Sequence, residues 1–353
     1  MEFSKAKAMV LPRTILAGHD VLLQLPEVVR DLRLGQRALM VTGQITHTVA
    51  GARIEQLMSE AGIHLEVCHV GAADREAVNR AVAAATDSRA TFLMGVGGGS
   101  KIDVAKLAAA RAGLPLVSVP TSAAHDGIAS PVASIRDQDK PHSIEAVMPM
   151  AIVADTRIIA QAPYRLLASG CADVIANITA VKDWELASRL KNEELSSTAK
   201  ALAEISARTI MENATAIRTN LEEGAWIAIK PIISSGLAMS IAGSSRPTSG
   251  SEHLFAHAVR ELTDERTYHG ETCGVGAIMM MYLHAGPWEK VRQALEDLGA
   301  PTTGAQLGLR EDEVIAALTK AHTMRPGRYT ILGESGLSTE SAKRLATITG
   351  VIG

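Results

Sequence analysis

The apolar residues before residue 156 occur in short uninterrupted runs, separated by longer amphipathic stretches. The run Arg37–Thr42, RALMVT, ends at a glycine and is typical of a strand buried on both faces of a parallel sheet. Similar runs predict strands at His64–Val70, Thr91–Val96, Leu114–Val119 and Met150–Ala154. The intervening stretches predict helices at Ala50–Ala61, Glu76–Ala85 and Ser100–Ala112. This alternation indicates an open parallel sheet flanked by helices.

Beyond Pro163 the apolar residues recur with the period of a helix, and no strand is predicted. Helices are expected at Tyr164–Arg189, Ser197–Leu221, Trp226–Ile241, His253–Leu262, Gly274–His284, Trp288–Leu298 and Glu311–Ala321. Pro231 is expected to start or kink the third of these helices. The fold class is therefore an α/β N-terminal domain, residues 1–160, followed by an all-α C-terminal domain, residues 161–353.

Composition narrows the possible functions. The 353 residues are 47% apolar, which suits two packed cores, and 3% aromatic with a net charge of −3, which argues against nucleic-acid binding. No apolar run of about 20 residues predicts a membrane span, and no signal peptide is recognisable at the N-terminus. Three widely separated cysteines, Cys68, Cys171 and Cys273, fit a reducing cytoplasm better than a disulfide framework.

A glycine-rich turn, Gly95-Val96-Gly97-Gly98-Gly99-Ser100, follows one predicted strand and opens a helix. Glycines allow the backbone to approach a pyrophosphate, and a helix N-terminus supplies free N–H groups. The alternative is a tight turn that binds nothing. The strand Arg37–Thr42 is followed by Gly43 and Gln44 instead of an acid, which favours NADP as well as NAD, unless an acid elsewhere holds the ribose.

Histidines and carboxylates supply a second candidate site. His253 and His257 share one face of a predicted helix, as do Asp173 and Asn177, whereas His269 lies in a predicted loop, Arg266–Glu271. Asp173, His253 and His269 together have the composition of a catalytic site for a divalent metal, usually Zn²⁺, with one position open. The alternative is that each histidine is structural. Cys171 and Cys273 are expected to be buried apolar residues instead of metal ligands, and Cys273 is kept as a less favoured candidate for a ligand of the metal.

These motifs, taken together, resemble the superfamily of iron-containing alcohol dehydrogenases, glycerol dehydrogenases and dehydroquinate synthases. The resemblance covers nearly the whole chain and is carried by Gly95–Lys106, Pro120–Pro131, Ser249–His257, Tyr268–Gly274 and Arg325–Leu332. It implies a Rossmann-like N-terminal domain, a helical C-terminal domain and a metal in the cleft between them, the dehydroquinate synthase-like arrangement.

The resemblance also implies roles for individual residues. Asp173, His253 and His269 would hold the metal; Asp126, Asp173 and His257 would contact the substrate. The implied cofactor contacts are Gly97, Gly98, Gly99, Ser100, Lys101, Thr121, Ser122 and Ala124, with Ser130 near the nicotinamide. Iron-dependent relatives have a histidine at the position of Asn177, so its absence favours zinc, although some bacterial relatives use nickel.

The resemblance is strongest to the archaeal branch that uses NAD(P)H to reduce dihydroxyacetone phosphate to sn-glycerol 1-phosphate for membrane lipids. His257 would then deliver a proton, directly or through water, and Asp126 would accept a hydrogen bond from a substrate hydroxyl. Without the resemblance, the favoured interpretations are that Asp126 is a turn residue and that His257 is a packed helix histidine. The substrate phosphate has no distinctive motif, with Lys101, Lys182, Lys230 and Arg260 all available. A homo-oligomer is expected.

Three other functions stay open at this point. A dehydroquinate synthase would need more basic residues than the cleft segments show, and a glycerol dehydrogenase would differ by lacking a phosphate pocket. A nucleotide-binding sensor, the alternative outside enzymes, is disfavoured by the complete carboxylate and histidine set.

Overall fold

A six-stranded parallel sheet forms the N-terminal half of the computed structural model, which describes residues 7–137, 140–219, 221–263 and 267–353. In sheet order its strands are β1 (Thr14–Gly18), β8 (Ala151–Asp155), β5 (Leu116–Pro120), β4 (Phe92–Gly97), β2 (Arg37–Thr42) and β3 (His64–His69). All its ladders are parallel. The five predicted strands are confirmed, with β2 exact and the others shifted by one or two residues. The edge strand β1 was missed.

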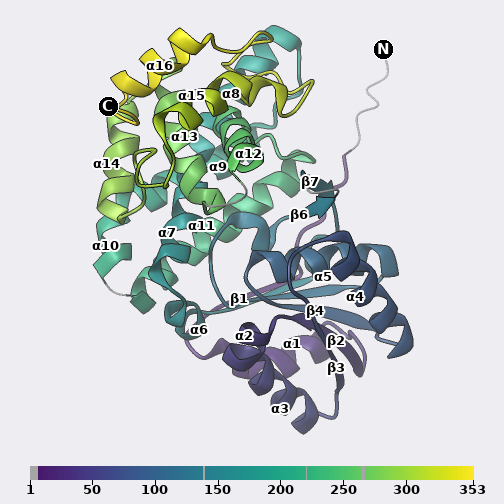
Figure 1. The fold of residues 1–353 in the computed structure, drawn as a ribbon. Coiled ribbons are helices and arrows are strands. Elements are labelled where there is room, and N and C mark those ends of the chain that lie inside the picture. Colours follow the sequence, from purple (N-terminus) through teal and green to yellow (C-terminus); the bar gives the residue numbers. More distant parts are fainter. Residues whose placement is uncertain (1–6, 138–139, 220, 264–266) are drawn as a thin grey trace.

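Helices cover both faces of this sheet (Figure 1). They are α1 (Leu25–Asp31), α2 (Gln44–Thr46), α3 (Ala52–Glu60), α4 (Arg75–Asp87) and α5 (Gly99–Ala112), with the short helical turns η1 (Val21–Gln24) and η2 (His47–Gly51). Along β2, Met40 packs in the cluster that contains α1 and α3, whereas Leu39 and Val41 pack with α4 and α5. Burial on both faces explains why the strands are continuous apolar runs in the sequence.

An antiparallel hairpin that the apolar pattern did not predict follows the turn η3 (Asp126–Ala129). Its strands are β6 (Val132–Asp137) and β7 (Lys140–Glu145). The fully buried Lys106 of α5 ties this region together, because its ammonium pairs with Asp103 at 2.8 Å and donates to the carbonyls of Gly127 and Val132. The turn η3 is thereby fixed to α5.

From residue 156 onward the described part of the chain contains helices and no strand, as predicted. They are α6 (Thr156–Gln161), α7 (Tyr164–Ile175), α8 (Asn177–Lys191), α9 (Ser197–Glu212), α10 (Ala214–Thr219), α11 (Leu221–Ala242), α12 (Ser251–Thr263), α13 (His269–Leu283), α14 (Trp288–Leu298), α15 (Glu311–Lys320), η4 (Ala321–Thr323) and α16 (Thr339–Ile348). Figure 1 shows these helices stacked above the sheet domain.

Several of the predicted helices differ from those in the structure. Tyr164–Arg189 is two helices that meet at Ala176, and Ser197–Leu221 is also divided. The expected loop around His269 is helical from that residue, because α13 starts there; Arg266 lies outside the described residues. The helices α6 and α16 were not predicted, whereas Trp288–Leu298 is exact.

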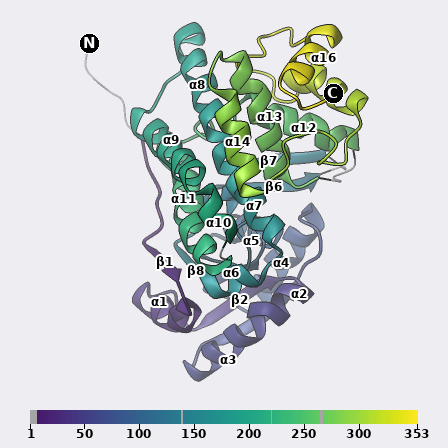
Figure 2. The same cartoon turned by 90° about the vertical axis from the view of Figure 1, so that its left-hand side faces the viewer.

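The helix α11 is long and apolar enough to cross a membrane by length and composition alone. It is nevertheless a core helix, because 67% of its apolar window is buried in the protein. It packs against α7, α9 and α10 and against the turn η3 (Figure 2), with Pro231 inside it.

Candidate active site

Three helices bring Asp173, His253 and His269 together. Asp173 lies on α7, His253 on α12 and His269 at the first position of α13. Oδ1 of Asp173 lies 3.6 Å from Nε2 of His253 and 3.7 Å from Nε2 of His269. Together with Sγ of the buried Cys273, one ligand atom from each residue lies within 4.8 Å of the others. The three residues expected to form a metal site therefore converge, with the less favoured Cys273 beside them.

The donors of this cluster fit a divalent cation. Asp173 Oδ1 is buried and has no hydrogen-bond partner among the described residues, whereas Oδ2 accepts the N–H of Asp126 at 3.3 Å. A buried carboxylate oxygen without a partner is costly, and a cation would satisfy it. One carboxylate and two imidazoles are a common donor set for a catalytic metal.

Glu252, which the sequence analysis missed, holds the ring of His253. Oε1 of Glu252 lies 3.0 Å from Nδ1 of His253, so that Nε2 faces Asp173. The carboxylate is itself held by the N–H of Gly250 at 2.6 Å and the hydroxyl of Thr179 at 2.7 Å. Its only sequence signal was its place immediately before His253. Such a partner fixes the tautomer of a ligand histidine.

Burial and neighbouring charges shift the pKa values of His253 and His269 in opposite directions. Burial lowers the pKa of His253, but the carboxylates Glu252 and Asp173 outweigh it and leave the pKa raised. Burial and the charges of His253 and His257 hold the pKa of His269 well below its usual value. The ring of His269 is therefore neutral near pH 7, the form that binds a metal.

Asp126 lies next to the metal cluster at the start of η3. Its Oδ2 accepts from Ser235 Oγ of α11 at 2.8 Å, and that hydroxyl in turn accepts from Nδ2 of Asn177 at 2.8 Å. Burial and the charge of Asp173 raise the pKa of Asp126 to about 6, against the lowering effect of Ser235. The close approach of α11 requires Gly236, because a Cβ there would lie 2.7 Å from the backbone of Ala129.

His257 lies one turn after His253 on the same helix. Its ring centroid is 6.4 Å from that of His253 and 6.1 Å from that of His269. Burial, followed by the positive charges of His253 and of Arg260, Arg325 and Arg328, lowers its pKa to about 3. The charges of three arginines thus act on this histidine, although the cleft segments were expected to be poor in basic residues.

The glycine-rich turn connects β4 to α5. Gly97 has a φ of +152°, which residues with a side chain rarely adopt, and Gly98 is the N-cap of α5. No side chain of the described residues caps this helix, so its first N–H groups remain available to an anion. A Cβ on Gly98 would lie 3.1 Å from Ser122 Oγ, and one on Gly99 only 1.6 Å from Nε2 of His125.

The segment after β5 joins this turn to the metal cluster. The N–H of Thr121 donates to the carbonyl of Gly97 at 3.0 Å, and Ser169 Oγ donates to the carbonyl of Ala124 at 3.3 Å. On the other side, Gly170 of α7 lies so close that a Cβ there would be 1.9 Å from the carbonyl oxygen of Ala123. The expected cofactor and metal residues are thus neighbours in space.

Two further expected cofactor residues lie at opposite ends of this region. Lys101 lies at the carboxyl ends of β2 and β3, where its ammonium donates to the carbonyl of Gly71 and its Cε would contact a Cβ on Gly43 at 2.7 Å. The buried hydroxyl of Ser130 donates to the carbonyl of Val132 at 3.1 Å.

Comparison with known proteins agrees with this architecture. A sequence model of the iron-containing alcohol dehydrogenase family matches residues 16–163. Relatives named glycerol-1-phosphate dehydrogenase (NAD(P)+) include one from Methanosarcina mazei, 51% identical over 349 residues, which are 99% of this chain and 98% of the relative. Another, from Methanothermobacter thermautotrophicus, is 51% identical over 97% of this chain and 98% of its own length.

Solved structures show the same fold at low sequence identity. A probable glycerol dehydrogenase from Sinorhizobium meliloti superposes with a TM-score of 0.79 at 20% identity, over 99% of this chain and all of that one. The glycerol dehydrogenase from Schizosaccharomyces pombe superposes with a TM-score of 0.78 at 18% identity, over 98% of this chain and 91% of that one. From its half-identical relatives, which it matches over nearly its whole length, the chain belongs to the glycerol-1-phosphate dehydrogenase family of the iron-containing alcohol dehydrogenases.

Proposed function

We propose that this protein reduces dihydroxyacetone phosphate to sn-glycerol 1-phosphate, with NADH or NADPH as the hydride donor, for archaeal-type membrane lipids. The observation that carries this is the convergence of Asp173, His253 and His269 next to a glycine-rich helix N-terminus. The names of the relatives supply the substrate. A simple glycerol dehydrogenase shares only the fold at 18–20% identity, and the relatives near 50% favour the phosphate ester.

Asp173, His253 and His269 would hold one divalent metal, and we propose zinc. Nitrogen and oxygen donors suit zinc, and Asn177 is engaged with Ser235 in place of a further histidine ligand. A bound divalent metal polarises a ketone oxygen as a Lewis acid. Glu252 keeps His253 in the tautomer that such a ligand needs.

The cofactor pyrophosphate would bind at Gly97, Gly98, Gly99 and Ser100, where the N-terminus of α5 supplies N–H groups. Thr121, Ser122 and Ala124 would line the same cleft, and Ser130 would lie towards the nicotinamide. The ammonium of Lys101, beside Gly43, would face the adenine ribose, which suits a 2′-phosphate. Both NADH and NADPH would therefore be accepted.

Asp126 and His257 would bind and orient the substrate. Asp126 would accept a hydrogen bond from a substrate hydroxyl, which selects the face of the ketone that meets the hydride. The neutral ring of His257 donates at one nitrogen and accepts at the other, so it can pass a proton from water to the substrate oxygen. Residues 1–160 would then serve as the cofactor domain and 161–353 as the metal and substrate domain.

Cytoplasmic location and assembly into a homo-oligomer complete the proposal. Cys171 and Cys273 are buried free thiols, which suits a reducing compartment. Light scattering on the purified protein measures the oligomeric state, and a monomer at micromolar concentration would contradict it.

One assay tests the reaction. NADPH oxidation is followed with dihydroxyacetone phosphate and with dihydroxyacetone, and NADP+ reduction is followed with glycerol, each before and after dialysis against a chelator. We expect rapid oxidation with the phosphate ester and its loss on chelation. The product is then offered to a dehydrogenase specific for the 3-phosphate enantiomer. Complete consumption by that enzyme, or faster reduction of unphosphorylated dihydroxyacetone, would refute the proposed reaction.

A further inference from the structure

Two arginines near the candidate active site have no acidic partner among the residues that the structure describes. Arg325 and Arg328 lie in the segment after η4, and both donate to the hydroxyl of Ser245, at 3.1 and 2.9 Å. Arg328 also donates to the carbonyl of Ser249, two residues before α12. Within the described ranges, no carboxylate forms an ion pair with either guanidinium. Two positive charges therefore share one neutral acceptor.

The carboxylates in this region are engaged elsewhere. Glu193 accepts two hydrogen bonds from Arg246, and Glu252 is held by His253, Thr179 and Gly250. Burial and the charges of Arg325 and Arg246 consequently lower the pKa of Arg328 to about 9. A partly buried pair of cations without a counter-charge is unfavourable, and an anionic ligand would relieve it.

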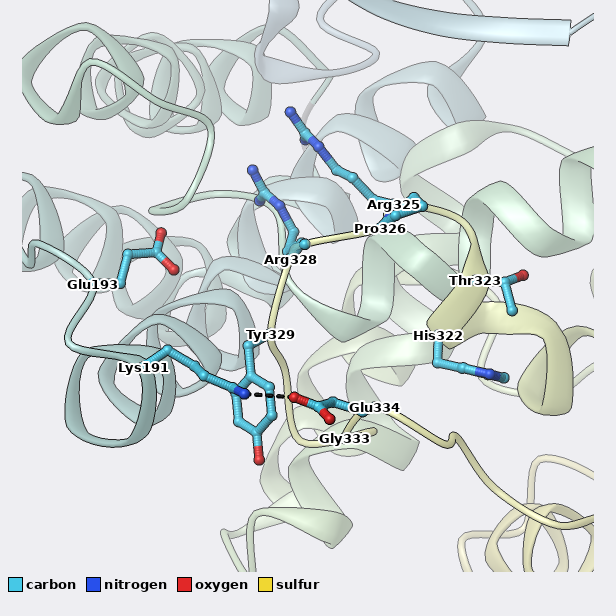
Figure 3. Close-up of a pocket in the computed structure, with 11 residues that line it drawn as sticks. Lys191, Glu193, His322, Thr323, Arg325, Pro326, Arg328, Tyr329, Gly333 and Glu334 are labelled. Carbon is cyan, nitrogen blue, oxygen red and sulfur yellow. Dashed lines mark hydrogen bonds and ion pairs between the residues drawn. The ribbon is translucent and has the colours of Figure 1, made fainter.

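The guanidinium charges of Arg325 and Arg328 act on one residue of the candidate active site, His257. Figure 3 shows the two side chains extending to the same side of their segment, away from the ion pair between Lys191 and Glu334. Burial and the charge of His253 lower the pKa of His257 most, and the charges of Arg260, Arg325 and Arg328 add to this lowering. A hollow of about 640 Å³ runs along the segment and is lined by both arginines.

The cations considered from the sequence are placed differently. The ammonium of Lys230 lies 3.8 Å from the ring centroid of Trp226, and Lys101 lies at the ends of β2 and β3 on the cofactor side. Arg260 donates to Ser134 at 3.3 Å and lies on α12 with His257. Arg325 and Arg328 are thus a pair of neighbouring cations, joined through Ser245, that acts on His257.

We propose that Arg325 and Arg328 bind the phosphate group of the substrate, an inference that rests on the proposed function for the identity of the phosphorylated ketone. Guanidinium groups bind phosphate through paired, charge-assisted hydrogen bonds, and two of them neutralise its double charge. A phosphate held there would lie near His257, on whose ring the charges of both arginines act.

The test compares Arg325→Gln and Arg328→Gln with Lys191→Gln, which removes a positive charge from the opposite side of the same segment. Isothermal titration calorimetry measures the affinity of the metal-loaded protein for inorganic phosphate. Steady-state assays measure the KM for dihydroxyacetone phosphate and kcat/KM for dihydroxyacetone. We expect each arginine variant to weaken phosphate binding and raise this KM about tenfold or more, with dihydroxyacetone turnover nearly unchanged. Lys191→Gln should behave as wild type.

Arg328→Lys distinguishes a loss of phosphate binding from a folding defect, because it keeps the positive charge and loses the paired hydrogen bonds of the guanidinium. We expect this variant to have a normal melting temperature and a KM for dihydroxyacetone phosphate between those of wild type and Arg328→Gln. Wild-type phosphate affinity in folded arginine variants would overturn the assignment, as would equal losses for the two ketones. If wild type fails to reduce dihydroxyacetone phosphate, the proposed function falls, and phosphate calorimetry with the same variants still decides the role of the arginines.

Discussion

Oε1 of Glu252 lies 3.0 Å from Nδ1 of His253, the next residue on α12. The same carboxylate accepts hydrogen bonds from the N–H of Gly250 and the hydroxyl of Thr179, which hold it beside the His253 ring. The consequence is that Nε2 of His253, and not Nδ1, faces Asp173. The orientation of the proposed metal ligand is therefore set by a residue that does not face the metal itself.

Glu252→Gln should lower metal affinity about 10- to 100-fold, because an amide is a weaker acceptor than a carboxylate for the His253 N–H. Competition with a chromophoric chelator measures that affinity. Glu340→Gln, at an exposed position in α16, is the matched control and should bind metal as wild type. Unchanged affinity in a folded Glu252→Gln protein would show that His253 orients without this carboxylate.

The sheet could be predicted because the burial of each strand is visible in the strand's own sequence as a continuous apolar run. Leu39 and Val41 are buried under one layer of helices and Met40 under the other, so β2 is apolar at every position that a parallel sheet covers. The hairpin of β6 and β7 has no such signal, since its strands are short and rich in polar residues. The start of α13 was missed because Gly270 packs against Ser169, a contact between distant segments.

The candidate site was predicted only in part, because it too depends on contacts between segments that are distant in the sequence. Asp173, His253 and His269 are residue types with few structural uses together, and the resemblance linked them. Ser235 and Glu252 are polar residues in helices, which ordinarily indicates a solvated face. Only the packing of α11 and α12 turns them inward, towards Asp126 and His253. Arg325 and Arg328 likewise become a candidate binding site only in the structure, where both donate to the hydroxyl of Ser245.

Gly98→Ala and Gly99→Ala should separate cofactor binding from folding. Gly98 has an extended backbone, and its new methyl group would meet only Ser122 Oγ at 3.1 Å, so stability should change by less than about 1 kcal/mol while the KM for NADPH rises about tenfold. At Gly99 the methyl group would displace His125, so a loss of about 1–3 kcal/mol in unfolding free energy is expected as well.

Thermal melting and cofactor titration of both variants provide the measurements. Normal NADPH binding by Gly98→Ala would show that the turn is purely structural, since the fold tolerates the added methyl group there.

Gly43→Asp should shift cofactor preference towards NADH. The new carboxylate would stand at the end of β2, where it repels a 2′-phosphate and draws the ammonium of Lys101 towards itself. The ratio of kcat/KM for NADPH to that for NADH should fall about tenfold or more. Ser59→Asp, which adds the same charge at an exposed position of α3, should leave the ratio unchanged. An unaltered ratio in Gly43→Asp would show that the adenine ribose does not bind at this edge of the sheet.

Ser235→Ala should impair catalysis through Asp126 and change its pH dependence. The hydroxyl of Ser235 donates to Oδ2 of Asp126 and lowers the pKa of that carboxyl, which burial and Asp173 raise to about 6. Without the hydroxyl the pKa rises further, so more of the protein carries a protonated Asp126 at any given pH below neutrality. If the carboxylate form accepts the substrate hydroxyl, the acidic limb of kcat/KM moves to higher pH, and its plateau falls roughly tenfold as orientation is lost.

The pH profile distinguishes this from a packing defect, which would lower kcat/KM equally at every pH. Ser235→Thr keeps a hydroxyl and should restore the position of the acidic limb. Ser234→Ala, one residue earlier on α11, is the matched control and should leave the profile as in wild type. An acidic limb that stays in place in Ser235→Ala would mean that Asp126 does not act as a carboxylate in the reaction, and that the contact with Ser235 serves only to join α11 to the turn that carries it.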